Sequence, residues 1–542
     1  MKQYKSFFGH LVLWYFLGNT FLFSQDILWE KSIGGKHADY LFDAVATADY
    51  GYILAGSSLS GKTGKKTDDN QGDLDYWLWK MDEKGDPEWQ KSYGGSGTDL
   101  LKSIILTNDG GYALAGSSNS ARGGDKKEAS FGGDDFWIIK LDARGNEQWQ
   151  RTLGGKGQEQ LHSIKQTTDG GYIIGGASGS DAIPAEQSVP NRQYAKNQHS
   201  FGNLDYWIVK LDRKGEIEWQ SSFGGRFADI VRSIEQTDDG GYIVGGYSNS
   251  PESGNKTEKN YGLGDYWVIK LDKDGKQEWQ KVYGGEGDDQ LYAIHQTRDG
   301  HYLLAGNSYS GTSGNKNVAN GKGSDIWLVK IDPAGEIRWQ KTIDIGKADY
   351  LTSLVENDDQ SLLLGCYARS EVYGTTKKDR ENINDYVAVK VDQAGEEIWR
   401  KTIGSGGEDI LKKAIQLRDG SYLMAGTSKG KASGDKKAPV GKNDFWVVRL
   451  KDKDKPDEDK LAIEAFPNPT AQYTNVIIGY EYETGTCSVF DLGGRQLQSF
   501  AIAKERTVPV DLDGLPEGIY IIEIRTNVQK DGIKVIKGIT KK

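Results

Sequence analysis

The sequence predicts an all-β protein, in which a seven-bladed β-propeller of about 60 residues per four-stranded repeat precedes a small C-terminal β-sandwich. Three observations lead to this fold class: a tryptophan lattice with a nearly constant period, four strand-like runs in each period, and a change of texture after residue 450. The 71 glycines and the 11% of aromatic residues fit a β protein with many tight turns.

Tryptophan sets the period of the repeat. One tryptophan recurs at steps of 60 residues, apart from a single step of 70. It lies at Trp29, Trp89, Trp149, Trp219, Trp279, Trp339 and Trp399. Self-similarity at a fixed period of this length is typical of solenoids, propellers and arrays.

Each period contains four runs that we expect to be antiparallel strands. The runs at 230–237 and 241–248 are joined by an aspartate-glycine turn, and those at 205–212 and 218–224 by a D-x-x-G turn. The two inner runs are apolar on both faces, as expected for a sheet that packs between two neighbours. Identical neighbours allow every sheet to bury both of its faces.

The two ends of the array predict its closure. The array begins with a single fourth-type strand at 27–35 and ends with a single third-type strand at 444–450. We expect the first to complete the last blade, so that the N-terminal strand closes a ring and hides both edges. An open solenoid is the alternative, and it leaves the two partial repeats unexplained.

The N-terminus has the layout of a secretory signal peptide, because Lys2 and Lys5 precede an apolar stretch at 7–23 and a small polar end. A membrane-spanning helix is the alternative, which the glycines and polar residues within the stretch disfavour. The predicted division is a cleaved signal peptide at 1–25, the propeller at 26–450, a charged linker at 451–462 and a second domain at 463–542.

Charge and residue usage exclude several classes of function. A net charge of -10 argues against nucleic acid and anionic lipid as partners. Cys366 and Cys487 fall in different predicted domains, so neither a disulfide framework nor a zinc or redox motif is expected. None of the six histidines lies in a nucleophile or metal-ligand motif, and no pair of acids stands out for glycoside hydrolysis. The sequence therefore favours a protein that is not an enzyme and predicts no cofactor, with calcium left open.

Strand direction predicts a functional face. The connections between blades and the loops between the second and third strands of each blade lie together, and the longest such loop is 181–203. Long loops on a rigid scaffold are frequent binding sites, although solvated filler is an equal alternative for any one loop. Tyr194 and Tyr261 are candidates for stacking on a ligand, and Trp79 is a third.

A carboxylate recurs in every connection between blades. The seven residues are Asp39, Asp99, Glu159, Asp229, Asp289, Asp349 and Asp409. A ring of acids is suited to binding a cation or sugar hydroxyl groups. The alternative is that each acid accepts backbone N–H groups at a tight turn. Presence in every blade favours this alternative, because a binding site normally breaks the symmetry of its scaffold.

The tail contains several ordered motifs: a proline-asparagine-proline opening, a D-x-x-G-R hairpin and an L-x-x-G-x-Y strand. Their residues include Pro467, Asn468, Pro469, Asp491, Gly494, Arg495, Gly518 and Tyr520. This tail resembles the type A C-terminal sorting domain of the type IX secretion system of Bacteroidota. The resemblance implies export by the signal peptide and then, through the type IX machinery as partner, across the outer membrane. Release or attachment at the cell surface would follow.

The repeats resemble arrays that are common in secreted Bacteroidota proteins. The sequence therefore predicts a secreted or cell-surface, monomeric propeller that binds carbohydrate or an extracellular protein through the long-loop face. The alternatives are a polysaccharide hydrolase or lyase and a purely structural adhesin.

Overall fold

The computed structural model describes residues 25–369, 383–452, 462–470 and 472–538. Apart from Gln25, the predicted signal peptide lies outside the described residues, as does most of the predicted linker. The described chain is all β, with one short 3-10 turn, η1 (Arg192–Tyr194). None of its described helical segments is long and apolar enough to cross a membrane.

The repeats form successive four-stranded antiparallel sheets, which confirms the predicted repeating all-β architecture. The first three sheets contain β2 (Asp39–Ala46), β3 (Tyr52–Ser58), β4 (Asp75–Met81), β5 (Pro87–Tyr93), β6 (Asp99–Leu106), β7 (Tyr112–Ser118), β8 (Asp135–Leu141), β9 (Glu147–Leu153), β10 (Glu159–Gln166), β11 (Tyr172–Ser178), β12 (Asp205–Leu211) and β13 (Ile217–Phe223). The next three contain β14 (Asp229–Gln236), β15 (Tyr242–Ser248), β16 (Asp265–Leu271), β17 (Gln277–Tyr283), β18 (Asp289–Gln296), β19 (Tyr302–Ser308), β20 (Asp325–Ile331), β21 (Ile337–Ile343), β22 (Asp349–Glu356), β23 (Leu362–Arg369), β24 (Asn384–Val391) and β25 (Glu397–Ile403). The last sheet contains β26 (Asp409–Gln416), β27 (Tyr422–Ser428), β28 (Asp444–Leu450) and the N-terminal β1 (Ile27–Ile33).

The short turns follow from their aspartates and glycines. In the turn between β12 and β13, Asp212 Oδ1 accepts hydrogen bonds from the backbone N–H groups of Lys214 and Glu216, at 2.7 and 2.8 Å. Gly215 has a φ of +79°, a left-handed conformation that glycine adopts without steric cost. The D-x-x-G spacing is therefore a requirement of this turn.

Aromatic residues hold neighbouring sheets together. The inner strands are buried on both faces, as in β12 and β16. Tyr206 of β12 packs against Trp267 of β16 with 4.8 Å between ring centroids. The same contact joins the last sheet to the first, because Phe445 of β28 lies 4.9 Å from Trp77 of β4. Six repeats thus carry a second tryptophan, which packs against an aromatic ring of the neighbouring sheet. These residues are Trp77, Trp137, Trp207, Trp267, Trp327 and Trp446.

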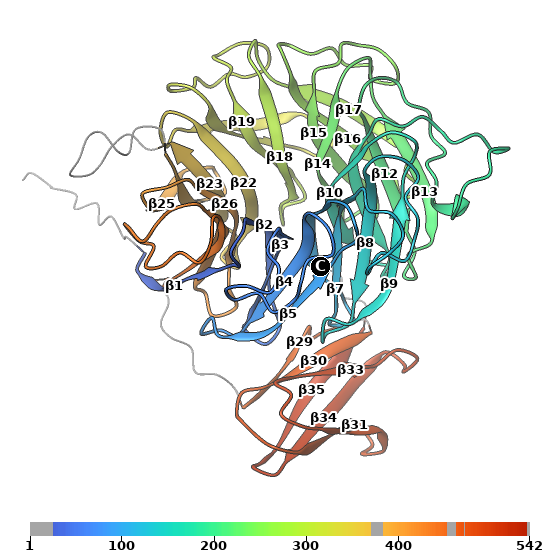
Figure 1. The fold of residues 1–542 in the computed structure, drawn as a ribbon, viewed down its shortest axis with the longest axis vertical. Helices are drawn as coiled ribbons and strands as arrows, with labels where there is room; N and C mark the ends of the chain where they lie inside the picture. The colour runs from blue at the N-terminus through green and yellow to red at the C-terminus, as the bar shows by residue number, and fades with distance from the viewer. Residues whose placement is uncertain (1–24, 370–382, 453–461, 471, 539–542) are drawn as a thin grey trace, which may run out of the picture.

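The first strands of the sheets surround the middle of the array (Figure 1). Each of β2, β6, β10, β14, β18 and β22 contacts the first strand of the next sheet, and β26 contacts β2. The N-terminal strand β1 pairs antiparallel with β28, with Ser32 opposite Trp446.

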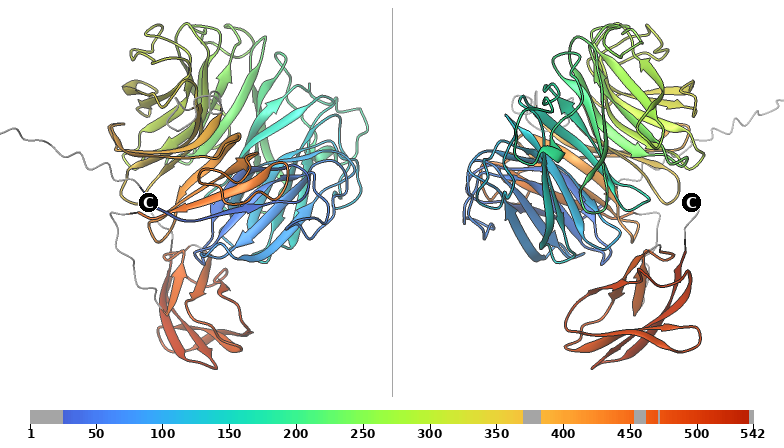
Figure 2. Two further views of the ribbon diagram at one scale, coloured as in Figure 1. Left: turned by 60° about the vertical axis from the view of Figure 1, so that its left-hand side comes forward. Right: turned by 90° about the vertical axis from the view of Figure 1, so that its right-hand side faces the viewer.

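The C-terminal domain consists of two antiparallel sheets around one core. Its strands are β29 (Ile463–Phe466), β30 (Tyr473–Ile478), β31 (Gly485–Asp491), β32 (Gln496–Ile502), β33 (Thr507–Asp511), β34 (Gly518–Thr526) and β35 (Lys530–Lys537). Buried side chains from both sheets, among them Val476, Val489 and Ile522, form a single cluster. Figure 2 shows this domain, in orange and red, beside the repeat array.

Candidate functional site

The long loops and the connections between sheets lie on one face of the array, which we call the loop face. In the first sheet, the backbone N–H group of Leu59, where the long loop begins, donates a 2.9 Å hydrogen bond to the carbonyl group of Ala38 in the connection. Asn119 and Thr98 repeat this pairing in the second sheet, at 3.1 Å. The loop face therefore has the composition that strand direction predicts.

The seven recurrent acids lie inside the protein. Their side chains are fully buried at Asp39, Asp99, Glu159, Asp229, Asp289, Asp349 and Asp409. Each accepts a hydrogen bond from the backbone N–H group four residues earlier, as Asp229 does from Gly225 at 2.7 Å. Ser250 Oγ donates a second hydrogen bond to Asp229, at 2.9 Å. The Asp229 carboxylate thus ties its connection to a loop, and a role of these acids in ligand binding stays a prediction.

A buried lysine anchors most of the long loops, which the sequence analysis missed. The residues are Lys66, Lys126, Lys196, Lys256, Lys316 and Lys436. Lys256 Nζ donates to Asn260 Oδ1 at 2.9 Å and lies 5.7 Å from the ring centroid of Trp267. Burial lowers the pKa of Lys256 to about 8, against the opposing effect of Asp229 and other acids. The sequence signal in five repeats was a lysine eleven residues before the tryptophan of the third strand, as Lys256 is before Trp267.

Exposed aromatic side chains gather on one sector of the loop face. Tyr261 is 45% exposed, and Phe201, Phe227 and Tyr309 are exposed to a similar degree on neighbouring loops and connections. These residues belong to the third, fourth and fifth sheets and the connection between the third and fourth. The sector is available for stacking against a ligand.

Tyr194 is not among the exposed aromatic residues of the loop face, although the sequence suggested it as a residue for stacking on a ligand. The insertion that contains it folds back as η1, and the Tyr194 side chain is only 3% exposed. Its hydroxyl group donates to Glu216 at 2.8 Å, and the Arg151 guanidinium group lies 5.1 Å from its ring centroid. Trp79 is buried as well.

One group of acids among the described residues has the spacing of a metal site. Ligand atoms of Asp325, Asp344 and Asp349 lie within 4.8 Å of one another. Asp344 occupies a position that is glycine in the other repeats. Burial, opposed by backbone hydrogen bonds and reinforced by the neighbouring acids, raises the pKa of Asp349 to about 7. Oxygen ligands suit calcium, so the calcium prediction applies here first.

The sorting motifs of the tail are structural elements of its two sheets. Asp491 Oδ1 accepts the Arg495 N–H group at 2.9 Å, and the two side chains form an ion pair of 3.1 Å. Gly494 supplies the positive φ of +77° that this turn between β31 and β32 requires. Gly518 begins β34, and Tyr520 is buried in the core.

The first motif of the tail, Pro467-Asn468-Pro469, contacts the last strand of the tail and faces the repeats. Asn468 Nδ2 donates to the Lys534 carbonyl group at 2.8 Å, and its Oδ1 accepts the Ile536 N–H group at 3.0 Å. Pro467 and Pro469 line a cavity of about 1090 Å³, whose opposite wall consists of short turns from the first three sheets. The tail therefore lies against the face opposite the loop face.

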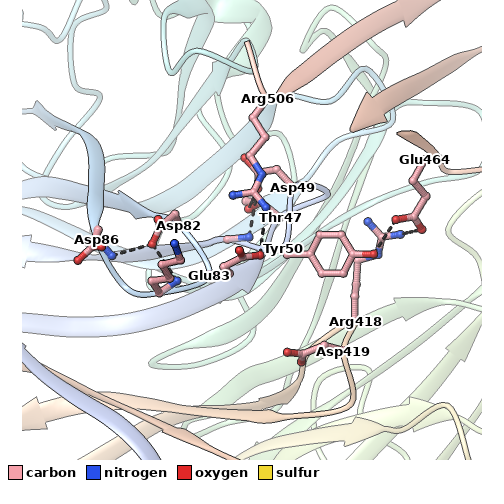
Figure 3. A network of polar contacts seen from close by, with 12 residues as sticks. Thr47, Asp49, Tyr50, Asp82, Glu83, Asp86, Arg418, Asp419, Glu464 and Arg506 are labelled. Carbon is pink, nitrogen blue, oxygen red and sulfur yellow. Dashed lines mark hydrogen bonds and ion pairs between the residues drawn. The ribbon is translucent and has the colours of Figure 1, made fainter. Parts of the chain in front are cut away.

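Polar contacts join the tail to this short-turn face (Figure 3). The Arg418 guanidinium group forms an ion pair with Glu464 and lies 4.6 Å from the ring centroids of both Tyr50 and Phe466. Arg506 Nη2 forms a second ion pair with Glu83 Oε2 at 3.0 Å, and Arg144 forms a third with Glu505. These contacts cover short turns of the first, second and last sheets.

Residues 464–538 match a family model described as the secretion system C-terminal sorting domain. The match confirms that a sorting domain of the type IX secretion system is present, so the protein is secreted to the cell surface or beyond. It covers the tail only, and the repeats lie outside it.

The chain shares weaker similarity with other proteins. Regulatory protein FlaEY of Caulobacter vibrioides is 28% identical over 137 residues, which are 24% of this chain and 14% of that protein. The chain thus spans about a seventh of the length of that relative. Among solved structures, a fungal alcohol oxidase of the AA5 family in complex with copper has a TM-score of 0.42 and 10% identity, over 94% of this chain and 99% of that one. A mutant of Synechocystis apocarotenoid oxygenase has a TM-score of 0.37 and 12% identity, over 79% of this chain and 94% of that one.

Proposed function

We propose that the repeats form a closed seven-bladed β-propeller in a secreted protein of the Bacteroidota. Three contacts support closure: β1 completes the sheet of β28, β26 lies against β2, and Phe445 packs on Trp77. A closed ring gives the last sheet its fourth strand, and the sheets then leave only short, protected edges. The predicted boundaries at residues 26, 450 and 463 belong to the same proposal.

The propeller is a binding protein that takes a carbohydrate or an extracellular protein on its loop face. The observation that carries this function is the sector of exposed aromatic side chains formed by Phe201, Phe227, Tyr261 and Tyr309. Aromatic rings supply large apolar contact areas at little entropic cost and dominate many interfaces. Contiguous apolar patches on a monomer commonly mark such sites.

The tail leaves this face free. The contacts of Glu464, Glu505 and Arg506 with the repeats all lie at the short turns, on the opposite side of the ring. The protein therefore presents its loop face while the tail is still attached. Recognition of the tail by the type IX machinery and recognition of a ligand are separate events on separate faces.

A glycan array tests this function with the mature chain, residues 26–542, in the presence and absence of calcium. Binding should fall at least about tenfold in Tyr261→Ala and in Phe227→Ala, because each removes a central ring. Ile398→Ala is the control, since Ile398 is 52% exposed on an outer strand. Product release instead of binding would support the polysaccharide hydrolase or lyase. Equal binding by all variants would refute the loop-face site.

A further inference from the structure

Every first strand of the repeats is interrupted by a β-bulge at its fourth residue. In β6, for example, the pairing with β7 runs through Leu101 and resumes at Ser103, which leaves Lys102 unpaired. The residues at this position are Phe42, Lys102, His162, Arg232, Tyr292, Thr352 and Lys412. We call them the bulge ring. A bulge bends its strand and redirects one side chain, and bulges are frequent next to functional sites.

The bulge ring breaks the internal symmetry of the repeats. The residue before it is leucine in six repeats and Val231 in the remaining one, and it is fully buried in all of them. The ring position itself carries six residue types, including two lysines and an arginine. The packing next to the ring position is therefore uniform, whereas the ring position itself varies and is cationic in three repeats.

Side chains of the bulge ring contact one another across sheets. Lys102 Nζ lies 4.5 Å from the ring centroid of Phe42, and Lys412 Nζ lies 5.7 Å from the same centroid. Arg232 Nη1 lies 3.4 Å from His162 Nδ1, and its guanidinium group lies 5.4 Å from the Tyr292 ring. All six of these side chains are half-buried.

No carboxylate within the described ranges forms an ion pair with Lys102, Arg232 or Lys412. The nearby acid Asp43 is paired with Lys413 at 3.1 Å and accepts the Ile104 N–H group at 3.1 Å. Charges taken out of water are normally paired, and neutral aromatic rings compensate them only in part. Burial and then the neighbouring Lys412 and Arg232 lower the pKa of Lys102 to about 8. The cluster therefore lacks negative charge in a protein whose net charge is -10.

His162 adds a directed donor to the cluster. Arginine only donates hydrogen bonds, so His162 Nδ1 accepts from Arg232 and the proton of the neutral ring lies on Nε2. Burial, with the charges of Arg232 and Lys102, lowers the pKa of His162, which keeps the ring neutral. His162 Nε2 is buried and has no hydrogen-bond partner among the described residues.

We propose that the bulge ring binds an oxyanion, a phosphate, sulfate or carboxylate group, held by Lys102, Arg232 and Lys412 and by the His162 Nε2–H group. The site rests on the closed ring proposed above, which brings Lys412 of the last sheet beside Phe42 of the first. It is separate from the aromatic sector of the loop face. An oxyanion supplies the acceptor and the charge that the cluster lacks, through charge-assisted hydrogen bonds.

Titration calorimetry of the mature chain with inorganic phosphate and with sulfate, at constant ionic strength, tests the site. Lys102→Met and Lys412→Met should each weaken binding about tenfold to a hundredfold, since each removes a charged donor. Lys276→Met, on an exposed short turn, makes the same change in net charge and should bind as the unmodified protein does. A sulfated disaccharide forms a second arm, and tighter binding than free sulfate would identify a sugar-borne anion as the natural source.

Thermal denaturation separates loss of the site from loss of the fold. Without added anion, Lys102→Met should melt at a higher temperature than the unmodified protein, because it removes repulsion and keeps the apolar stem. Tyr261→Ala should leave phosphate binding unchanged, so this site and the loop-face site fail independently. Absence of phosphate and sulfate binding, or equal weakening by Lys276→Met and Lys102→Met, would overturn the proposal.

Discussion

The Tyr50 hydroxyl group donates a 2.6 Å hydrogen bond to Glu464 Oε2, across the interface between the repeats and the tail. Tyr50 has a φ of +65°, in a turn where most other repeats have glycine at this position. A tyrosine in this left-handed region costs on the order of 1–3 kcal/mol. The turn of the first sheet therefore contains a destabilising backbone conformation at the place where it contacts the tail.

Replacing this tyrosine should stabilise the propeller and loosen the tail. In Tyr50→Gly, relief of backbone strain should raise the free energy of unfolding by about 1 kcal/mol. Loss of the hydrogen bond to Glu464 should make the tail more accessible, so limited proteolysis between the domains should be faster. Gln360→Gly is a matched control, because Gln360 occupies the same turn position with a φ of +65° in the sixth sheet. It should stabilise the protein without changing the rate of proteolysis, and faster cleavage in both variants would contradict this role of Tyr50.

A disulfide designed across the terminal strands tests closure. Lys31 of β1 lies opposite Val447 of β28, so Lys31→Cys combined with Val447→Cys should cross-link the two ends of the array. A bond that closes such a long loop should add about 2–4 kcal/mol of stability. The two natural cysteines are buried, so neither competes. Non-reducing electrophoresis and melting with and without reductant provide the measurements, with Lys31→Cys alone as the control. An uncross-linked double variant would argue for an open array.

Much of the fold could be predicted because each repeat is stabilised by packing against a copy of itself. The spacing of Trp267, the D-x-x-G turn at Asp212 and the glycine at 494 are local requirements, and each is visible in the sequence. The placement of Tyr194 was not predictable in this way, because its insertion occurs once and folds back onto Glu216.

The bulge ring was hidden for a related reason. Burial alternates along β6 and shifts by one position at Lys102, whereas the residue types of this strand show no clean alternation. The position of a bulge depends on how the strand pairs with its neighbour. The residue pattern along a single strand does not show this pairing. Tyr50, by contrast, had a signal, since it replaces a glycine of the repeat.

Buried acids should make the protein less stable as the pH rises from about 4 to 7. Burial raises the pKa of Asp265 to about 7 from an ordinary value of 3.8, and that of Asp135 also to about 7. In this window the unfolded chain releases its protons first, so the free energy of unfolding falls as pH rises. Asp265→Asn should remove up to roughly 4 kcal/mol of that fall in urea denaturation series. Asp272→Asn is the control, because Asp272 is exposed and its pKa is lowered, so this variant should keep the fall.

The calcium prediction can be tested at the three acids of the fifth and sixth sheets. Oδ1 of Asp325 and Oδ1 of Asp349 are buried without hydrogen-bond partners among the described residues. Calcium at about 100 times its dissociation constant should stabilise the protein by about 2.7 kcal/mol, measured as a rise in melting temperature. Asp344→Gly restores the glycine of the other repeats and should abolish this rise while increasing stability without calcium. A calcium effect of equal size in both proteins would place the ion elsewhere.

The charge of Lys102 should control both stability and anion binding above pH 8. Its pKa in the folded protein is about 8, lowered by burial, Lys412 and Arg232, against an ordinary value of 10.5. Between these two values the unfolded chain binds more protons, so the free energy of unfolding should rise with pH, by up to roughly 3.4 kcal/mol from this residue. Lys102→Met should lose this rise, whereas Lys276→Met should keep it.

The pH dependence of sulfate affinity provides a second measurement of the same titration. Sulfate keeps its charge across this range, so a decrease in its affinity between pH 7 and 9 would come from the protein. We expect that decrease in the unmodified protein and a smaller one in Lys102→Met, in which only Lys412, whose pKa is also lowered by burial, is left to titrate. The protons do not come from His162, because the pKa of His162 lies below its ordinary value and its ring is neutral throughout. An affinity that stays constant to pH 9 would mean that Lys102 does not contact the anion.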